Sequence, residues 1–162
     1  MKKAPQGQPL HNAFTMIELI FVVIVLGILS AIALPKFAST KRSADIASGR
    51  ADISVIRAAI VSERQTQLVK GVNTYIPNLS ANTTTLFTGS GTIPAKAKDQ
   101  NRMLLLYGIK AGTGSGNWAV TNAAKKTYTY TVDEVATTFD YNSSTGIFAC
   151  KADEDNCNAL VD

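Results

Sequence analysis

The residues from Phe14 to Leu34, FTMIELIFVVIVLGILSAIAL, form an almost wholly apolar run. As a helix, this segment spans about 31 Å, close to the thickness of the hydrocarbon core of a bilayer. Glu18 is its only charged residue, and a carboxylate in hydrocarbon costs several kcal/mol unless a cation pairs with it. The run therefore predicts a membrane helix whose single carboxylate needs a partner.

The helical pattern continues beyond Pro35, where we expect a kink rather than a stop. An amphipathic stripe follows at helical spacing, made of Ile46, Ile53, Ile56 and Ile60. The charged residues between and just after them, of which Glu63 and Arg64 are the last, are expected on a solvated face. Lys70-Gly71 is typical of a helix end. We therefore predict one long helix from Phe14 to Lys70, about 85 Å in length.

The rest of the chain has the features of a β-rich domain. Residues 72–103 are expected to form an irregular linking region, with a short helix or turn near Lys96–Arg102. Alternation or apolar runs predict strands at 104–109 (LLLYGI), 118–120 (WAV) and 127–132 (TYTYTV), followed by a hairpin over 137–150. In TYTYTV, the tyrosines and Val132 are expected to share one buried face.

These elements predict an α+β fold, in which an antiparallel sheet of about four strands packs on the rear half of the helix. The apolar front half is expected to protrude from this domain, because a sheet of this size cannot cover the whole rod. The predicted organisation is a basic leader at 1–13, an apolar helix at 14–35 that lipid or other copies of the chain must cover, and a globular domain at 36–162.

The C-terminal region contains two candidate sites. Cys150 and Cys157 are the only cysteines, so a disulfide is predicted if the domain is exported, and two free thiols are the alternative. Asp153 and Asp155 lie between them and can contribute to a calcium site, although a solvated charge run is the simpler interpretation. With one histidine and no catalytic triad or Cys/His pair, the sequence predicts no enzymatic activity and no other cofactor.

Two simple interpretations of the front segment leave residues unexplained. A plain membrane anchor accounts for its length but not for Glu18. A conventional signal peptide would be cleaved after Ala33, at an Ala-x-Ala site. That cleavage would discard a helix whose amphipathic continuation follows directly, and it does not account for an acid inside the apolar segment.

A third interpretation accounts for more of these residues. The junction Ala13-Phe14-Thr-Met-Ile-Glu18, followed by the apolar run with Gly27 and Pro35, resembles the class III signal of type IV pilins and type II secretion pseudopilins. The resemblance implies that a prepilin peptidase cleaves between Ala13 and Phe14 and that Phe14 is then N-methylated. The family favours glycine before the cleaved bond, where this chain has alanine. Glu18 becomes the fifth residue of the mature chain, as in the family.

The resemblance also implies a function. Cleavage creates an α-ammonium at Phe14, about one helical turn from Glu18, and this cation can neutralise the carboxylate within the chain or in a neighbouring copy. The chain would be a structural subunit of a type IV pilus or secretion-type pseudopilus. Its partners would be further copies of itself, the prepilin peptidase, an inner-membrane assembly platform and lipid. It would be a single-pass inner-membrane protein with a periplasmic domain, and then part of a filament.

A second hypothesis is a monomeric, membrane-anchored binding module. The chain carries a mild net charge of +4, so DNA is a candidate ligand for such a module. The basic residues available for that role are Lys96, Lys98, Arg102, Lys125 and Lys126.

Overall fold

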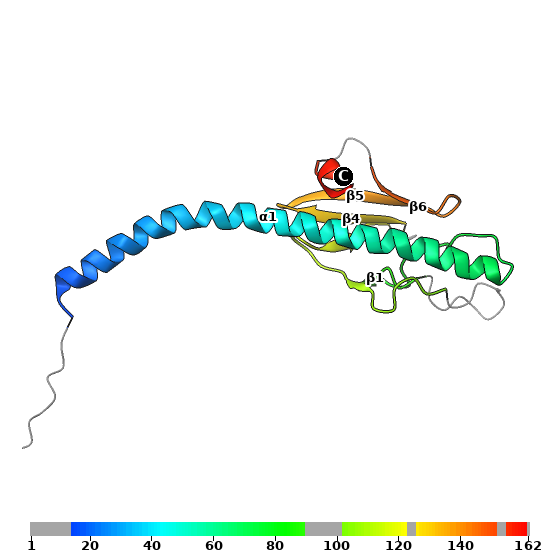
Figure 1. Cartoon of the computed structure of the whole chain (residues 1–162), viewed down its shortest axis with the longest axis horizontal. Helices are drawn as coiled ribbons and strands as arrows, with labels where there is room; N and C mark the ends of the chain where they lie inside the picture. Colours follow the sequence, from blue (N-terminus) through cyan, green and yellow to red (C-terminus); the bar gives the residue numbers. More distant parts are fainter. Residues whose placement is uncertain (1–13, 90–101, 123–125, 152–154, 162) are drawn as a thin grey trace, which may run out of the picture. The chain divides into compact units, whose positions relative to one another are not determined.

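The structure is a computed structural model of the chain, and it describes residues 14–89, 102–122, 126–151 and 155–161. The elements are helix α1 (Met16–Val69), strands β1 (Thr85–Leu86), β2 (Ile109–Lys110), β3 (Trp118–Val120), β4 (Thr127–Val132), β5 (Val135–Asn142) and β6 (Ile147–Cys150), and helix α2 (Cys157–Val161) (Figure 1). The chain divides into two compact units, Met1–Thr40 and Lys41–Asp162, which we describe separately.

Helix α1 confirms the long helix predicted from the sequence. It contains Pro35 inside its span, so the helix does not stop at this residue. Many of its front residues are Val and Ile, whose branched side chains lower helix propensity slightly in water. A bilayer reverses this preference, because only a helix satisfies every backbone polar group within a single spanning segment.

The end of α1 is fixed by a Schellman motif at the predicted glycine. Gly71 has a φ of 77°, a conformation that glycine adopts without steric cost. The N–H of Gly71 donates to the carbonyl of Leu68 at 3.0 Å, and the N–H of Val72 donates to the carbonyl of Gln67 at 2.9 Å. These two bonds satisfy carbonyls that the helix itself leaves unpaired.

A four-stranded antiparallel sheet in the order β3-β4-β5-β6 lies beside the rear half of α1 (Figure 1). The predicted alternation in β4 is confirmed: Tyr128, Tyr130 and Val132 are buried, and the threonines between them are less so. Strand β4 pairs with β5 over its whole length, from Thr127 opposite Asp140 to Val132 opposite Val135. The predicted α+β class and the hairpin ending at Cys150 are therefore correct.

The strand predicted at 104–109 is mostly wrong. Only Ile109 belongs to a strand, in the two-residue β2 that pairs with β1. Leu104 and Leu105 donate their N–H groups to the carbonyls of Thr88 and Phe87 and pack against the core. Leu106 and Tyr107 are exposed by 72% and 87%. The segment 104–109 is therefore not one buried strand: its first two leucines pack on the core, and Leu106 and Tyr107 face solvent.

The core of the second unit joins α1 to the sheet through aromatic rings. Ile53, Ile56 and Ile60 of the predicted stripe are buried, and Ile46 packs against them at the margin. They face a cluster of rings contributed by Phe87, Trp118, Tyr128, Tyr130, Phe139 and Phe148. Gly49 is buried in α1, and a Cβ there would lie 2.5 Å from the ring of Tyr130. This glycine therefore lets the sheet approach the helix closely.

Burial of tyrosine predicts a loss of stability in alkali. Tyr128 is fully buried, and its hydroxyl lies 3.0 Å from the hydroxyl of Ser80. Burial raises the pKa of Tyr128 from 10.0 to about 12, partly offset by the hydrogen bond with Ser80. The phenol therefore ionises in the unfolded chain before it does in the folded one, so stability is complete below pH 10 and falls as the pH rises toward 12.

We expect the free energy of unfolding to fall by about 2 kcal/mol between pH 9 and pH 12 through Tyr128 alone. Denaturant unfolding across this range measures the slope. Tyr128→Phe should have a visibly shallower slope, although the raised pKa values of Tyr130 and Tyr141 keep some pH dependence. Equal slopes for the two proteins would show that Tyr128 is not the titrating group.

Candidate functional site

The first unit presents an apolar surface. Every large apolar side chain from Phe14 to Leu34 is exposed, from 38% at Val25 to 82% at Met16. An 18-residue window of α1 near the N-terminus has a mean hydropathy of 2.9 and no buried residue. By length and composition this helix can cross a membrane, as a signal sequence or the core helix of a soluble protein also could. A core helix is mostly buried in its own domain, whereas this segment is not.

Glu18 lies in the first turn of α1, where its backbone is part of the helix cap. The N–H of Glu18 donates to Oγ1 of Thr15 at 3.3 Å, and the N–H of Leu19 donates to the carbonyl of Thr15 at 3.2 Å. Thr15 is therefore the N-cap, and Thr-Met-Ile-Glu has the spacing of a capping box. A carboxylate in the first turn is also favoured by the helix dipole.

The predicted cleavage site is only partly within the described residues. Phe14 is described and is 77% exposed, whereas Ala13 lies outside the described residues. Phe14 immediately precedes the N-cap Thr15. A cut before Phe14 would place the new α-ammonium next to the cap and about one helical turn from Glu18.

The C-terminal cysteines form the predicted disulfide, Cys150–Cys157, with their Cα atoms 6.0 Å apart. It joins the end of β6 to the start of α2. Leu160 of α2 is buried against Gly49, and Nε of Arg50 donates to the carbonyl of Ala159 at 2.6 Å. The disulfide thus helps to hold a short helix against α1 that has few apolar contacts of its own.

The predicted calcium site stays a prediction. Asp153 lies outside the described residues. Asp155 is described, and its backbone carbonyl accepts a 2.7 Å hydrogen bond from the hydroxyl of Thr137. Within the described ranges, no group of three or more His, Cys, Asp or Glu side chains is arranged to hold a metal ion.

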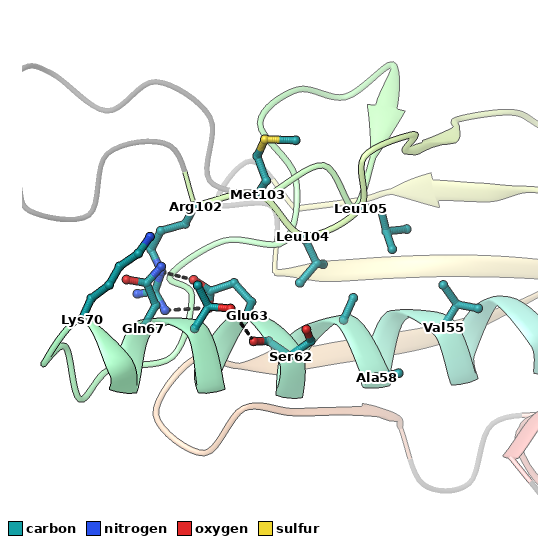
Figure 2. A pocket seen from close by; sticks show the side chains of 12 residues that line it. Val55, Ala58, Ser62, Glu63, Gln67, Lys70, Arg102, Met103, Leu104 and Leu105 are labelled. Atoms are coloured by element: carbon teal, nitrogen blue, oxygen red, sulfur yellow. Dashed lines mark hydrogen bonds and ion pairs between the residues drawn. The ribbon is translucent and has the colours of Figure 1, made fainter.

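A groove of about 620 Å³ runs beside the last turns of α1 in the second unit (Figure 2). Its walls come from α1 and from the segment 102–105. The lining residues are Val55, Ala58, Ala59, Ser62, Glu63, Thr66, Gln67, Lys70, Arg102, Met103, Leu104 and Leu105. Figure 2 shows the charged pair of Glu63 and Arg102, joined by dashed lines, beside Lys70 and Gln67.

Glu63 and Arg102 form a buried, bidentate ion pair. Nε and Nη2 of Arg102 donate to the two carboxylate oxygens of Glu63 at 2.6 and 2.7 Å, and both side chains are almost wholly buried. The same guanidinium donates to the carbonyls of Thr74 and Tyr75. All three guanidinium nitrogens of Arg102 donate hydrogen bonds, so this residue connects the end of α1 to the loop that follows it.

The expectation that Glu63 is solvated is therefore wrong, and the sequence carried the signal that corrects it. Spacings of three and four continue from Ile56 and Ile60 to Glu63 and Gln67, so these two polar residues lie on the buried stripe. A pattern limited to apolar residues ends at Ile60. No comparable pattern indicated the burial of Arg102, because its partner lies 39 residues away.

The residues proposed for DNA binding are not gathered at one described surface. Arg102 is 2% exposed and is committed to Glu63, so it is not available to a phosphate backbone. Nζ of Lys126 donates to the hydroxyl of Ser143 at 3.3 Å. The remaining lysines of that set, Lys96, Lys98 and Lys125, lie outside the described residues.

Comparisons with known proteins do not assign this chain to a family. No protein-family model matches it, and no curated protein and no solved structure gives a match.

Proposed function

We propose that the chain is a structural subunit of a filament of the type IV pilus or type II secretion pseudopilus kind. It would be cut by a prepilin peptidase before Phe14, N-methylated there, held in the inner membrane by the front of α1 and assembled by a membrane platform. The observation that supports this most is the exposed apolar front of α1, which carries one carboxylate, Glu18, in its first turn.

The exposed front helix needs a cover both in the membrane and in a filament. Its apolar side chains are covered by lipid in the membrane-inserted subunit, and neighbouring copies of the same helix would cover them in a filament. Exposure of apolar surface to water costs about 25 cal/mol per Å², so subunits that leave the bilayer would be held together by side-by-side packing of these helices. The domain of the second unit has its own core and would remain on the outside.

The carboxylate of Glu18 would set how neighbouring front helices align along their length in the filament. A buried charge without a partner is strongly disfavoured, whereas an ion pair with good geometry is tolerated. Glu18 would pair with the α-ammonium of Phe14, in its own chain or in a neighbouring copy. Before cleavage the nitrogen of Phe14 is part of an amide, so the pairing would be possible only in the processed subunit.

Glu18→Gln tests this role, because glutamine keeps the capping-box position but removes the charge. We expect the variant to be inserted and cleaved, while its incorporation into sheared filaments falls about tenfold or more, because an unpaired ammonium is left in an apolar core. Ser30→Ala, in the same apolar segment, is the matched control and should assemble normally. Normal cleavage together with normal incorporation of Glu18→Gln would exclude the pairing role.

A further inference from the structure

The groove beside α1 contains a buried polar group that nothing in the described chain satisfies. Gln67 is 6% exposed, and its side-chain amide has no hydrogen-bond partner among the described residues. A buried amide normally finds a partner, in the protein, in water or in a ligand. Since Gln67 lines the groove, its donor and acceptor are available to whatever occupies it (Figure 2).

The remaining walls specify the chemistry of an occupant. Val55, Ala58 and Met103 make one part of the groove apolar, and Val55 and Met103 are about half exposed. Glu63 and Arg102 neutralise each other, so Lys70 provides the only unbalanced charge among the lining residues. The groove therefore fits a segment that offers an apolar side chain, a peptide group and a carboxylate.

A segment with this chemistry is present in the same unit, at the turn between β4 and β5. Val135 is 41% exposed, although it is β-branched and apolar. Asp133 is paired with Arg42 at 2.6 Å, whereas Glu134 is exposed and makes no interaction with the described residues. Both acids have positive φ values, 49° and 66°, at the two positions where hairpin turns of this kind favour Asn and Gly. Such backbone conformations in non-glycine residues are concentrated at functional sites.

The turn and the groove lie at opposite ends of the second unit. Arg42, which contacts the turn, is near the start of the part of α1 in this unit, and Lys70 follows its end. The 28 helical residues from Arg42 to Val69 correspond to about 40 Å. Figure 1 shows the same arrangement, with the shared end of β4 and β5 remote from the end of α1.

From this geometry we infer that the β4–β5 turn of one copy docks into the groove of the next copy. The carboxylate of Glu134 would pair with the ammonium of Lys70, Val135 would pack against the half-exposed Met103, and a peptide group of the turn would satisfy the amide of Gln67. The two surfaces are different and lie at opposite ends, so the contact is head-to-tail and can repeat without closing. This inference rests on the proposed filament function and defines an axial contact within it.

Photo-cross-linking of the full-length chain in cells that assemble the filament tests the contact. A benzoylphenylalanine at Ala58 probes the groove, and one at Ile24 probes packing of the front helices. We expect Ala58 to cross-link two copies, with the adduct mapped by mass spectrometry to the peptide that contains Val135. Ile24 should also cross-link copies if the front helices form a common core.

Charge reversal tests the pairing. Lys70→Glu or Glu134→Lys alone should lower the Ala58 cross-link about tenfold, because like charges would then meet, and the double variant should restore it. Both side chains are exposed, so neither change removes a buried contact. Lys151→Glu, another exposed lysine, is the matched control and should leave the cross-link unchanged.

The outcomes separate the inference from the function on which it rests. Cross-linking at Ile24 without an adduct at Val135 from Ala58 would overturn the inferred contact and leave the filament intact. An Ala58 adduct to a different protein, or to another part of this chain, would also overturn it, as would failure of the double variant to restore it. No cross-link between copies from either position would reject the filament itself.

Discussion

Arg102→Met is expected to lower the free energy of unfolding by about 3–5 kcal/mol, the usual cost of removing one partner of a buried ion pair. The substitution leaves the carboxylate of Glu63 in a buried site without its counter-ion. It also removes the donor from the carbonyls of Thr74 and Tyr75, so the loop after α1 loses its link to the helix. Denaturant unfolding of the full-length protein in detergent measures the loss.

Two variants show that the cost arises from the unpaired charge. Glu63→Leu combined with Arg102→Met should recover part of the stability, because a buried ion pair can be replaced by apolar residues at little cost. Recovery should be incomplete, because the carbonyls of Thr74 and Tyr75 still lack the hydrogen bonds that Arg102 donates. Arg42→Met is the exposed control: its pair with Asp133 is 44% exposed on both sides, and such pairs contribute about 1 kcal/mol or less. A loss from Arg102→Met no larger than that from Arg42→Met would contradict this account of the ion pair.

Trp118→Ala is the second substitution with a large expected effect. Trp118 is 1% exposed, and its ring lies 4.9–5.4 Å from the ring centroids of Tyr130, Phe139 and Phe87. Removal of a buried aromatic side chain costs about 3–5 kcal/mol, because apolar contacts are lost and a cavity remains. The variant also removes the indole N–H that donates to Oδ2 of Asp52 at 2.9 Å.

Trp118→Phe separates packing from the hydrogen bond. It keeps an aromatic ring in the cluster and removes only the indole donor and part of the volume, so a loss of about 1–2 kcal/mol is expected. Tyr107→Ala, at a residue that is 87% exposed, is the control and should be nearly neutral. Equal melting temperatures for wild type and Trp118→Ala would show that this cluster is not the core of the domain.

The parts of the fold that the sequence predicted are those with a regular period. The front of α1 is recognisable by its length and apolarity, and its rear by isoleucines at helical spacing. In β4 the strict alternation of Tyr and Thr specified both the strand and its buried face. Each of these signals arises from local geometry, since side chains repeat every 3.6 residues in a helix and every two in a strand.

The parts that the sequence did not predict depend on distant partners. In the run 104–109, hydrophobicity alone could not show that Leu104 and Leu105 pack inward while Leu106 and Tyr107 face solvent, because hydrogen bonds to the loop around Phe87 decide this. Helix α2 is only five residues long, and its position depends on the disulfide and on contacts with α1. The partnership of Arg102 with Glu63 is likewise a tertiary contact.

The candidate site also has a part that the sequence predicts and a part that depends on distant contacts. Phe14 and Glu18 could be identified from the sequence, because a single acid in an apolar run is conspicuous and its distance from the predicted cut is fixed by the helix. The groove could not be predicted, because its walls come from segments separated by more than 30 residues. Its most informative feature, the unpartnered amide of Gln67, becomes evident only when the side chains around it are placed.

The mass and N-terminal sequence of the protein isolated from membranes test the central claim most directly. If the chain is a filament subunit of this kind, it should begin at Phe14 and carry one additional methyl group on its α-nitrogen. A chain that begins at Leu34 would instead be the product of a conventional signal peptidase, without the helix that the filament requires. An uncut chain that begins at Met1 would lack the α-ammonium at Phe14 and would also contradict the proposal.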